Sequence, residues 1–220
     1  MDDPLEPHTV QSELKILRSG VISWWRTQEF NFPWRTREGS EWEALVTEVL
    51  LQRTRANAVK ELYREFFEKY NGVERLHDAS EDEIREDISS LGLHWRAEYL
   101  SSLGTVLSER GGRVPEDRAD IEELPGIGQY AAGAFLTFKR HRRVTFIDAN
   151  IVKLLGRFLG FEWGGETRRK AWFVDLADAF FDHDYPPAEF GYAVLDFTRE
   201  ICGRSPKCEL CPVQGNCAYP

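Results

Sequence analysis

Hydrophobic residues recur along most of the chain at the three- and four-residue spacing of amphipathic helices. Between Trp42 and Leu50 the apolar positions follow i, i+3, i+4, i+7 and i+8, which places them on one helix face. A second such helix is expected over residues 58–67, and another over 96–110, ended by the two glycines that follow it. The pattern predicts further helices over residues 12–27, 117–123, 129–139, 149–159, 168–181 and 187–200.

Local signals indicate where some of these helices begin. Ser12 is expected to cap the first helix, and "SEDE" at 80–83 has the pattern of a capping box that opens a helix with Ile84 and Ile88. The β-branched run at 144–147 is too short to imply a sheet, and no repeat of solenoid length is present. The sequence therefore predicts an all-α fold.

Composition then limits the class of protein. The chain has 220 residues, of which 42% are hydrophobic, enough for one large core or two modest ones. No apolar run approaches the roughly 20 residues of a membrane span. The first ten residues do not form a signal peptide, so we expect a soluble cytoplasmic protein.

The charge pattern bears on nucleic-acid binding. A net charge of −9 argues against such a partner. Basic residues are nevertheless concentrated at 139–143, "KRHRR", and local clustering decides whether a phosphate backbone is attracted. A solvated face is the alternative interpretation of this run.

The stretch "LPGIGQY" at 124–130 has the pattern of a helix-hairpin-helix motif. Pro125 fixes φ, and Gly126 and Gly128 are expected to adopt conformations closed to residues with side chains. The turn would expose backbone N–H groups at a helix N-terminus, where anions bind. Glycines lack Cβ, so a DNA phosphate would approach closely. An ordinary turn between helices is the alternative.

All four cysteines lie close together near the end of the chain: Cys202, Cys208, Cys211 and Cys217. Disulfides are not expected in a chain without a secretion signal. Structural zinc usually takes two separated pairs of ligands. One compact loop with four thiolates favours an iron–sulfur cluster, and zinc or free structural cysteines remain alternatives.

The hairpin and the cysteine loop, in this order, resemble the endonuclease III/MutY superfamily of DNA glycosylases. Within it, the likeness is greatest to the mismatch-specific thymine-DNA glycosylases. The segments that carry the resemblance, besides the cysteine loop, are "FPWR" (32–35), "VTEVLLQRT" (46–54), "GGRVPEDRADIEELPGIGQY" (111–130) and "VTFIDANIVKLLGRF" (144–158).

The resemblance implies two helical lobes, with DNA bound across the cleft between them. Residues 31–141 would form a continuous helical barrel, and residues 1–30 would join 142–220 in a lobe that carries a 4Fe-4S cluster. We expect double-stranded DNA as the partner, no membrane, and a monomeric protein.

The resemblance also implies two catalytic carboxylates that act on a base flipped from the duplex. Asp148, in "IDAN", matches the catalytic aspartate after the hairpin, although alone it is equally an N-cap. A capping carboxylate is kept ionised by backbone N–H groups, ready to stabilise a cationic sugar. Glu48 matches a glutamate of the base pocket, where it would protonate the leaving base or position water. From its position alone, Glu48 is an exposed residue.

Tyr130 occupies the position at which the lyase branch, similar to endonuclease III, has a lysine that attacks the sugar. A phenol cannot form a Schiff base. The resemblance therefore implies a monofunctional glycosylase, which uses water and leaves an abasic site. The thymine-mismatch branch carries tyrosine here and the adenine branch, as a rule, serine. A core aromatic residue is the alternative.

DNA contacts are expected from two further segments. Gln52 and Arg53 follow Glu48, and Arg53 matches the position that fills the gap left by the flipped base. A surface salt bridge is the alternative for Arg53. The loop "GLHWR" (92–96) matches a second wedge, in which Leu93, His94 or Trp95 would insert. This loop is one residue shorter than in the thymine branch, and the first cysteine gap is five residues rather than six.

Together these features predict a base-excision DNA glycosylase that removes thymine or uracil opposite guanine. An adenine glycosylase would keep Glu48 and Asp148, but Tyr130 and the absence of a domain after the cysteine loop disfavour it. A non-catalytic iron–sulfur DNA-binding protein would not need both carboxylates.

Overall fold

The computed structural model describes residues 7–36 and 39–219, and these ranges contain helices and loops but no strand. The prediction of an all-α fold is therefore confirmed. The chain divides into two units, Asn31–Arg140 and a second unit made of Met1–Phe30 with His141–Pro220. Within the described ranges, no helix has the length and apolar character needed to cross a bilayer.

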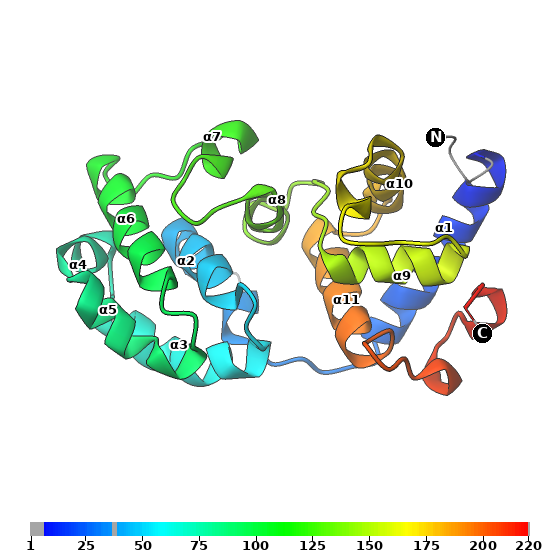
Figure 1. Ribbon diagram of the computed structural model, residues 1–220, viewed down its shortest axis with the longest axis horizontal. Coiled ribbons are helices and arrows are strands. Elements are labelled where there is room, and N and C mark those ends of the chain that lie inside the picture. Colours follow the sequence, from blue (N-terminus) through cyan, green and yellow to red (C-terminus); the bar gives the residue numbers. More distant parts are fainter. Residues whose placement is uncertain (1–6, 37–38, 220) are drawn as a thin grey trace. The chain divides into compact units, whose positions relative to one another are not determined.

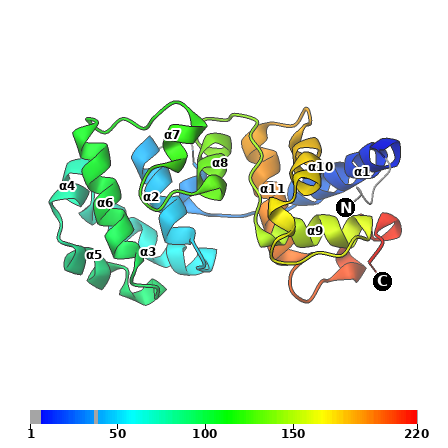
Figure 2. The same ribbon diagram turned by 45° about the horizontal axis from the view of Figure 1, so that its top comes forward.

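The unit Asn31–Arg140 is built around α2, whose apolar stripe is buried as predicted. Leu45, Val46, Val49 and Leu50 have no exposed surface, and α2 packs against α3, α6 and α8. Figure 1 and Figure 2 show these helices. The elements of this unit are η1 (Pro33–Arg35), α2 (Glu41–Leu51), α3 (Ala56–Lys69), α4 (Val73–Asp78), α5 (Glu81–Asp87), η2 (Ser89–Leu91), α6 (Arg96–Glu109), α7 (Arg118–Glu122) and α8 (Gln129–Phe138).

Helix capping in this unit differs from the prediction. A complete capping box opens α2, where Glu43 N donates to Ser40 Oγ and Ser40 N donates to the Glu43 carboxylate at 2.6 Å. At α5, Ser80 accepts a bond from Glu83 N, but the Glu83 carboxylate pairs with Arg75 at 2.7 Å instead of closing the box. A tertiary ion pair thus competes for the carboxylate that the local pattern assigned to the cap.

The second unit packs α1 against α9, α10 and α11. Its elements are α1 (Pro7–Trp25), α9 (Ala149–Leu159), η3 (Thr167–Arg169), α10 (Ala171–Phe181), α11 (Pro187–Glu200), η4 (Cys208–Leu210) and η5 (Gln214–Asn216). The predicted cap Ser12 is wrong, because α1 begins five residues earlier. The helix predicted over 168–181 is also interrupted, since Lys170 is extended and α10 begins after it.

Candidate active site

The hairpin joins two helices of the unit Asn31–Arg140, as the sequence predicts. It connects α7 to α8, and Ile127 N donates to Leu124 O at 2.9 Å across the turn. Gly128 is the N-cap of α8, with no side chain to satisfy the first N–H groups of the helix. These donors remain available to an acceptor from outside the turn.

The two hairpin glycines serve different purposes. Gly126 has φ +76°, and a Cβ there would lie 3.0 Å from Tyr99 Cβ, so its conformation and its surroundings both favour glycine. Gly128 has φ −103° and ψ −176°, which any residue adopts. The expectation of a conformation closed to other residues is therefore wrong for Gly128. A Cβ at Gly128 would meet no heavy atom within 4 Å, so the position is open to an approaching ligand.

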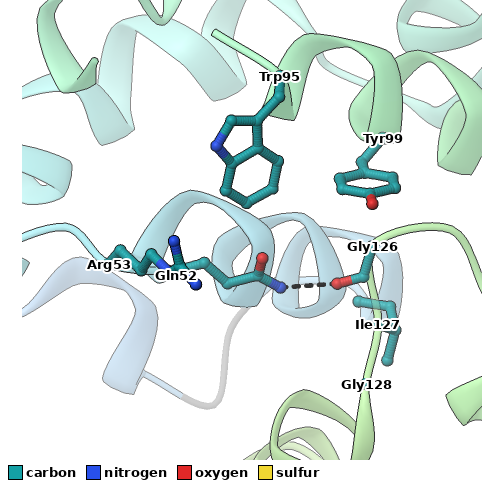
Figure 3. Close-up of a pocket in the computed structure, with 7 residues that line it drawn as sticks. All are labelled: Gln52, Arg53, Trp95, Tyr99, Gly126, Ile127 and Gly128. Atoms are coloured by element: carbon teal, nitrogen blue, oxygen red, sulfur yellow. Dashed lines mark hydrogen bonds between the residues drawn. The ribbon is translucent and has the colours of Figure 1, made fainter. Parts of the chain in front are cut away.

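An open pocket of about 590 Å³ lies beside the hairpin, wholly within this unit. Figure 3 shows the residues that line it, which are Gln52, Arg53, Trp95, Tyr99, Gly126, Ile127 and Gly128. The structure thus brings together Trp95, one of the three candidates for the second wedge, and four other residues that were predicted to contact DNA: Gln52, Arg53, Gly126 and Gly128. Tyr99 was missed by sequence reasoning, although it lies four residues after Trp95 and therefore on the same helix face.

The end of α2 is tied to the hairpin through Gln52. Its Nε2 donates to Gly126 O at 2.6 Å, as the dashed line in Figure 3 shows. Arg53, the next residue, has φ +53° and an exposed side chain. Non-glycine residues adopt this conformation infrequently, so the chain reverses here at an energetic cost. The bend directs two consecutive side chains into one pocket.

A buried arginine holds the loop of residues 92–96 in place. Arg96 has no exposed surface, and its guanidinium donates to the carbonyls of Leu50, Leu91 and Gly92. Burial lowers the pKa of Arg96 from its usual value. Carbonyls at the ends of helices carry partial negative charge, which offsets the cost of burying the guanidinium.

Of the three wedge candidates, only Trp95 lines the pocket. Leu93 is half-buried at φ +54°, and its carbonyl accepts from Arg96 N at 3.1 Å. His94 is exposed and does not line the pocket. The positive φ at Leu93 turns the chain so that Trp95 and Tyr99 project toward the hairpin, as Figure 3 shows for both rings.

Glu48 is a dehydrated carboxyl group on α2. No hydrogen bond or ion pair connects it to the other described residues, and burial raises its pKa to about 8. An acid of this pKa is largely protonated at neutral pH and is suited to proton donation. The sequence pattern alone indicated an exposed residue, and that interpretation is wrong because the group is half-buried.

Asp148 is the N-cap of α9, in the other unit. Its Oδ1 accepts from Asn150 N at 2.9 Å and from Ile151 N at 2.8 Å, and its Oδ2 accepts from Asn150 Nδ2 at 2.9 Å. Three donors bound to a half-buried carboxylate fix its orientation. The capping role foreseen for Asp148 is present, and it leaves the carboxylate available at the end of the helix.

Tyr130 is the second residue of α8 and is half-buried. It therefore follows the N-cap Gly128 by two residues, at the position predicted for it. Glu48 and Tyr130 belong to the unit Asn31–Arg140, whereas Asp148 belongs to the other unit.

The cysteine loop is anchored on α1 and α9. Val213 is buried and lies so close to Gly20 that a Cβ on this glycine would be 2.2 Å from Val213 Cγ1. Farther along, Ala218 N donates to Phe158 O at 3.0 Å. The loop therefore has a defined course over the helices beneath it, with the four cysteines at Cys202, Cys208, Cys211 and Cys217.

The arrangement of the four thiols is compatible with one shared group of several metal ions. All are half-buried, and each of Cys211 and Cys217 interacts electrostatically with the other cysteines, while burial raises the pKa of both thiols. Among the described residues no set of three His, Cys, Asp or Glu side chains is gathered around a single-ion site. A cluster of several iron atoms takes one thiolate per iron and does not need ligands gathered around a single ion.

Arg157, on α9, supports this fit. Its Nη1 lies 3.6 Å from Cys202 Sγ and donates to Gly203 O at 2.7 Å. Its Nε is buried and has no hydrogen-bond partner among the described residues. A buried cation with an unused donor beside the loop complements a cluster with anionic thiolate ligands.

The basic run at 139–143 is less available than its sequence indicates. Arg140 is mostly buried, and its guanidinium binds the Glu41 carboxylate at 2.8 and 3.0 Å and Pro115 O at 2.7 Å. Lys139 donates to Gly39 O. At least Arg140 is therefore a structural residue and not a phosphate ligand.

Two family models match this chain. The HhH-GPD superfamily of base excision DNA repair proteins matches residues 46–174, and the iron–sulfur binding domain of endonuclease III matches residues 203–217. The second match contains three of the four cysteines, and Cys202 lies one residue before it.

Similar proteins and structures cover nearly the whole chain. The thymine/uracil-DNA glycosylase of Methanothermobacter thermautotrophicus is 34% identical over 209 residues, which are 93% of each chain. That of Pyrobaculum aerophilum is 37% identical and covers 90% of this chain and 89% of its own. A solved thermostable thymine-DNA glycosylase has a TM-score of 0.85 at 34% identity, covering 94% of this chain and 96% of its own.

Proposed function

Because this chain belongs to the HhH-GPD superfamily of base excision DNA repair proteins, we propose that it releases thymine, and uracil, from mispairs with guanine. The similarity to two thymine/uracil-DNA glycosylases over nine-tenths of the chain is the observation that carries this proposal. The proposed reaction is hydrolysis of the N-glycosidic bond of a nucleotide flipped from double-stranded DNA.

Two carboxyl groups divide the proposed chemistry. Glu48, with a pKa raised to about 8, donates a proton to the departing base, which leaves more readily when neutral. Asp148, fixed by three donors, presents a carboxylate to the sugar as positive charge develops at its anomeric carbon. A water molecule then attacks that carbon, and the strand retains an abasic site.

Tyr130 supports the proposal that the enzyme is monofunctional. The lyase reaction needs an amine that forms a Schiff base with the sugar, and a phenol cannot supply one. The expected product is an abasic site in an intact strand.

We assign a 4Fe-4S cluster to the four cysteines of the C-terminal loop. The match to the iron–sulfur domain of endonuclease III and the position of Arg157 support this assignment. When bound, the cluster would bear negative charge beside Arg157 and hold the loop on α1 and α9. Purified protein is expected to absorb near 400 nm, an order-of-magnitude position for cysteine-ligated clusters. Colourless protein that carries one zinc per chain after anaerobic purification would overturn the assignment.

One experiment tests the target base and the lyase question together. Duplexes with G·T, G·U, A·8-oxoguanine and thymine glycol are incubated with enzyme, then analysed for strand breaks with and without alkali. The proposal predicts breaks in G·T and G·U duplexes only after alkali. Release of adenine opposite 8-oxoguanine alone would identify an adenine glycosylase instead. Breaks without alkali would show lyase activity, and no reaction on any duplex would favour a non-catalytic DNA-binding protein.

A further inference from the structure

Arg157, near the C-terminal end of α9, carries a buried charge whose acceptors are not carboxylates. The residue is 8% exposed. Among the described residues, its guanidinium donates to the carbonyls of Cys202, Gly203 and Arg204 and to the Cys202 sulfur, and its Nε has no acceptor. An arginine remains protonated inside a protein, and a buried cation without a counter-ion is costly. An anion within the loop would offset this cost.

The Cys202 sulfur is the acceptor that can supply this anion. It accepts a hydrogen bond from Arg157 Nη1 at 3.6 Å, and a cysteine bound to iron is a thiolate. The backbone of Arg157 contacts a second cysteine, because Cys217 Sγ lies 3.5 Å from Arg157 O. Lys153 also interacts electrostatically with Cys202, but its Nζ donates to Asn150 Oδ1 at 3.1 Å. Arg157 is therefore the cation in direct contact with the sulfur.

Tyr219 separates this contact from water. Its ring centroid is 4.8 Å from the guanidinium carbon of Arg157. The ring is 39% exposed, whereas Arg157 is 8% exposed, so the ring forms the outer layer. Its position is fixed through the preceding residue, because Ala218 N donates to Phe158 O at 3.0 Å. Two charges interact more strongly where water is excluded from between and around them.

The charge of an iron–sulfur cluster changes with its redox state, since reduction adds one electron. A buried cation that donates an N–H group to a ligand sulfur stabilises the more negative, reduced form more than the oxidised form. Hydrogen bonds to the sulfurs and solvent exposure are among the factors that set the reduction potential of such clusters. Arg157 and Tyr219 supply both factors at one cysteine.

We propose that Arg157 raises the reduction potential of the cluster through its contact with the Cys202 sulfur, and that Tyr219 maintains this effect by excluding water. Arg157 is a positioning residue in this role, because it acts through a cysteine. The inference rests on the proposed function, since it assumes that the four cysteines hold a 4Fe-4S cluster. It adds a protective role for the arginine, because a cluster of higher potential gives up an electron less readily.

The test measures the midpoint potential of full-length, cluster-containing protein in the absence of DNA. An electrode supplies or accepts the single electron, and the visible absorbance of the cluster reports its redox state. Arg157→Met removes the charge and the donors but keeps a long side chain. It should shift the equilibrium about tenfold toward the oxidised cluster, which lowers the potential by about 59 mV for one electron. An equilibrium within about twofold of wild type, at equal iron content, would overturn the inference.

Three further variants grade the effect. Arg157→Lys keeps the charge but not the planar donor group, and should shift the equilibrium by about threefold or less. Tyr219→Ala admits water to the guanidinium and should also shift it about threefold, whereas Tyr219→Phe keeps the ring and should match wild type. If Arg157→Met retains no iron, these variants decide the question. Equal potentials in wild type, Arg157→Lys and Tyr219→Ala would then overturn the inference.

Two controls separate the sulfur contact from general charge and from loop displacement. Arg204, two residues after Cys202, is exposed, so Arg204→Met removes the same charge where solvent screens it, and should leave the potential unchanged. Gly20→Ala places a methyl group against Val213 and disturbs the loop without changing its charge. It should retain less iron, with an unchanged potential for the remaining cluster. A shift in either control as large as in Arg157→Met would overturn the inference.

The outcomes distinguish this inference from the proposed function. Wild-type protein that carries zinc in place of iron would refute the cluster assignment and, with it, the role of Arg157. Wild-type protein with full iron content that releases neither thymine nor uracil would refute the proposed reaction, while the potentials would still decide the role of Arg157. Normal base release together with equal potentials in wild type and Arg157→Met would overturn this inference alone.

Discussion

Two acidic residues, one in each unit, lie in opposite environments. Glu48 is half-buried on α2, without a hydrogen-bond partner among the described residues, and burial raises its pKa to about 8. Asp148 lies at the start of α9 and accepts three hydrogen bonds. Dehydration favours the neutral form of a carboxyl group, whereas N–H donors bind the anionic form.

In the proposed mechanism, this difference allows the same functional group to supply two chemical roles. A position in the middle of a packed helix provides dehydration. A helix N-terminus provides hydrogen-bond donors and a favourable dipole. Variants that change charge but not shape can test each environment by itself.

The largest effect is expected from Asp148→Asn. Asparagine caps helices as well as aspartate does, so the thermal midpoint should change little. Asparagine has no charge to stabilise the sugar, so base release should fall about 10²-fold or more. Single-turnover release from a G·T duplex, with DNA binding and thermal unfolding as controls, measures this. Turnover within a few-fold of wild type would remove Asp148 from the catalytic mechanism.

Glu48→Gln should reduce the release rate about 10²-fold at pH 7, the lower range for general acid catalysis. The pH profile gives the sharper test. With a pKa of about 8, Glu48 loses its proton above that pH, so the wild-type rate should decline while the low rate of the variant stays constant. A wild-type rate that instead increases through pH 8 would mean that the carboxylate, and not the acid, is the active form.

The same group makes folding stability depend on pH. Unfolded Glu48 ionises near 4.5 and folded Glu48 near 8, so its contribution is complete below pH 4.5 and is lost as pH rises to 8. The shift corresponds to at most about 5 kcal/mol. Relative to wild type, Glu48→Gln should therefore become progressively more stable between pH 5 and 8.5. Urea unfolding of both proteins at several pH values measures the difference, and a constant difference would contradict a raised pKa.

Some features of the fold and of the candidate site could be predicted from the sequence, and others could not. Helical spacing predicted α9 and α11 to the residue, because buried faces recur every three to four positions. The N-cap role of Asp148 was also foreseen, since it depends only on the next three residues. The dehydration of Glu48 was not visible in the residue pattern, because it depends on the side chains of other helices.

Long-range polar contacts account for most of the remaining differences. Arg140 is read as a free cation in "KRHRR", but Glu41, nearly a hundred residues earlier, removes it from solvent. Arg96 likewise appears as one basic residue of a loop, whereas it binds Leu50 O on α2. Tyr99 belongs to the pocket only because Gly126 approaches it. A local sequence pattern cannot predict contacts between residues that are far apart in the chain.

A smaller effect, on the free energy of unfolding, is expected when the N-cap of α9 is removed. Asp148→Ala removes the acceptor of the Asn150 and Ile151 N–H groups and should cost about 1 kcal/mol, whereas Asp148→Asn should cost only a few tenths. Urea unfolding of the three proteins at pH 7 measures both values. Equal stability of the alanine and asparagine variants would show that the cap contributes little, and that the carboxylate is held there for chemistry alone.

The smallest effect, a gain, is expected from Tyr130→Lys. Tyr130 is the second residue of α8. The lyase branch that this family resemblance implies has a lysine at the same position. Wild-type protein should leave the strand intact until alkali is added, and borohydride should trap no complex. The lysine variant should acquire weak strand cleavage and a trappable Schiff base. The gain should be small, since the amine must reach the sugar carbon to about 3–3.5 Å and be partly deprotonated.

Tyr130→Met is the control, because it has a similar length and no amine. Efficient trapping by the wild type or by the methionine variant would identify a different lysine as nucleophile and contradict the monofunctional assignment.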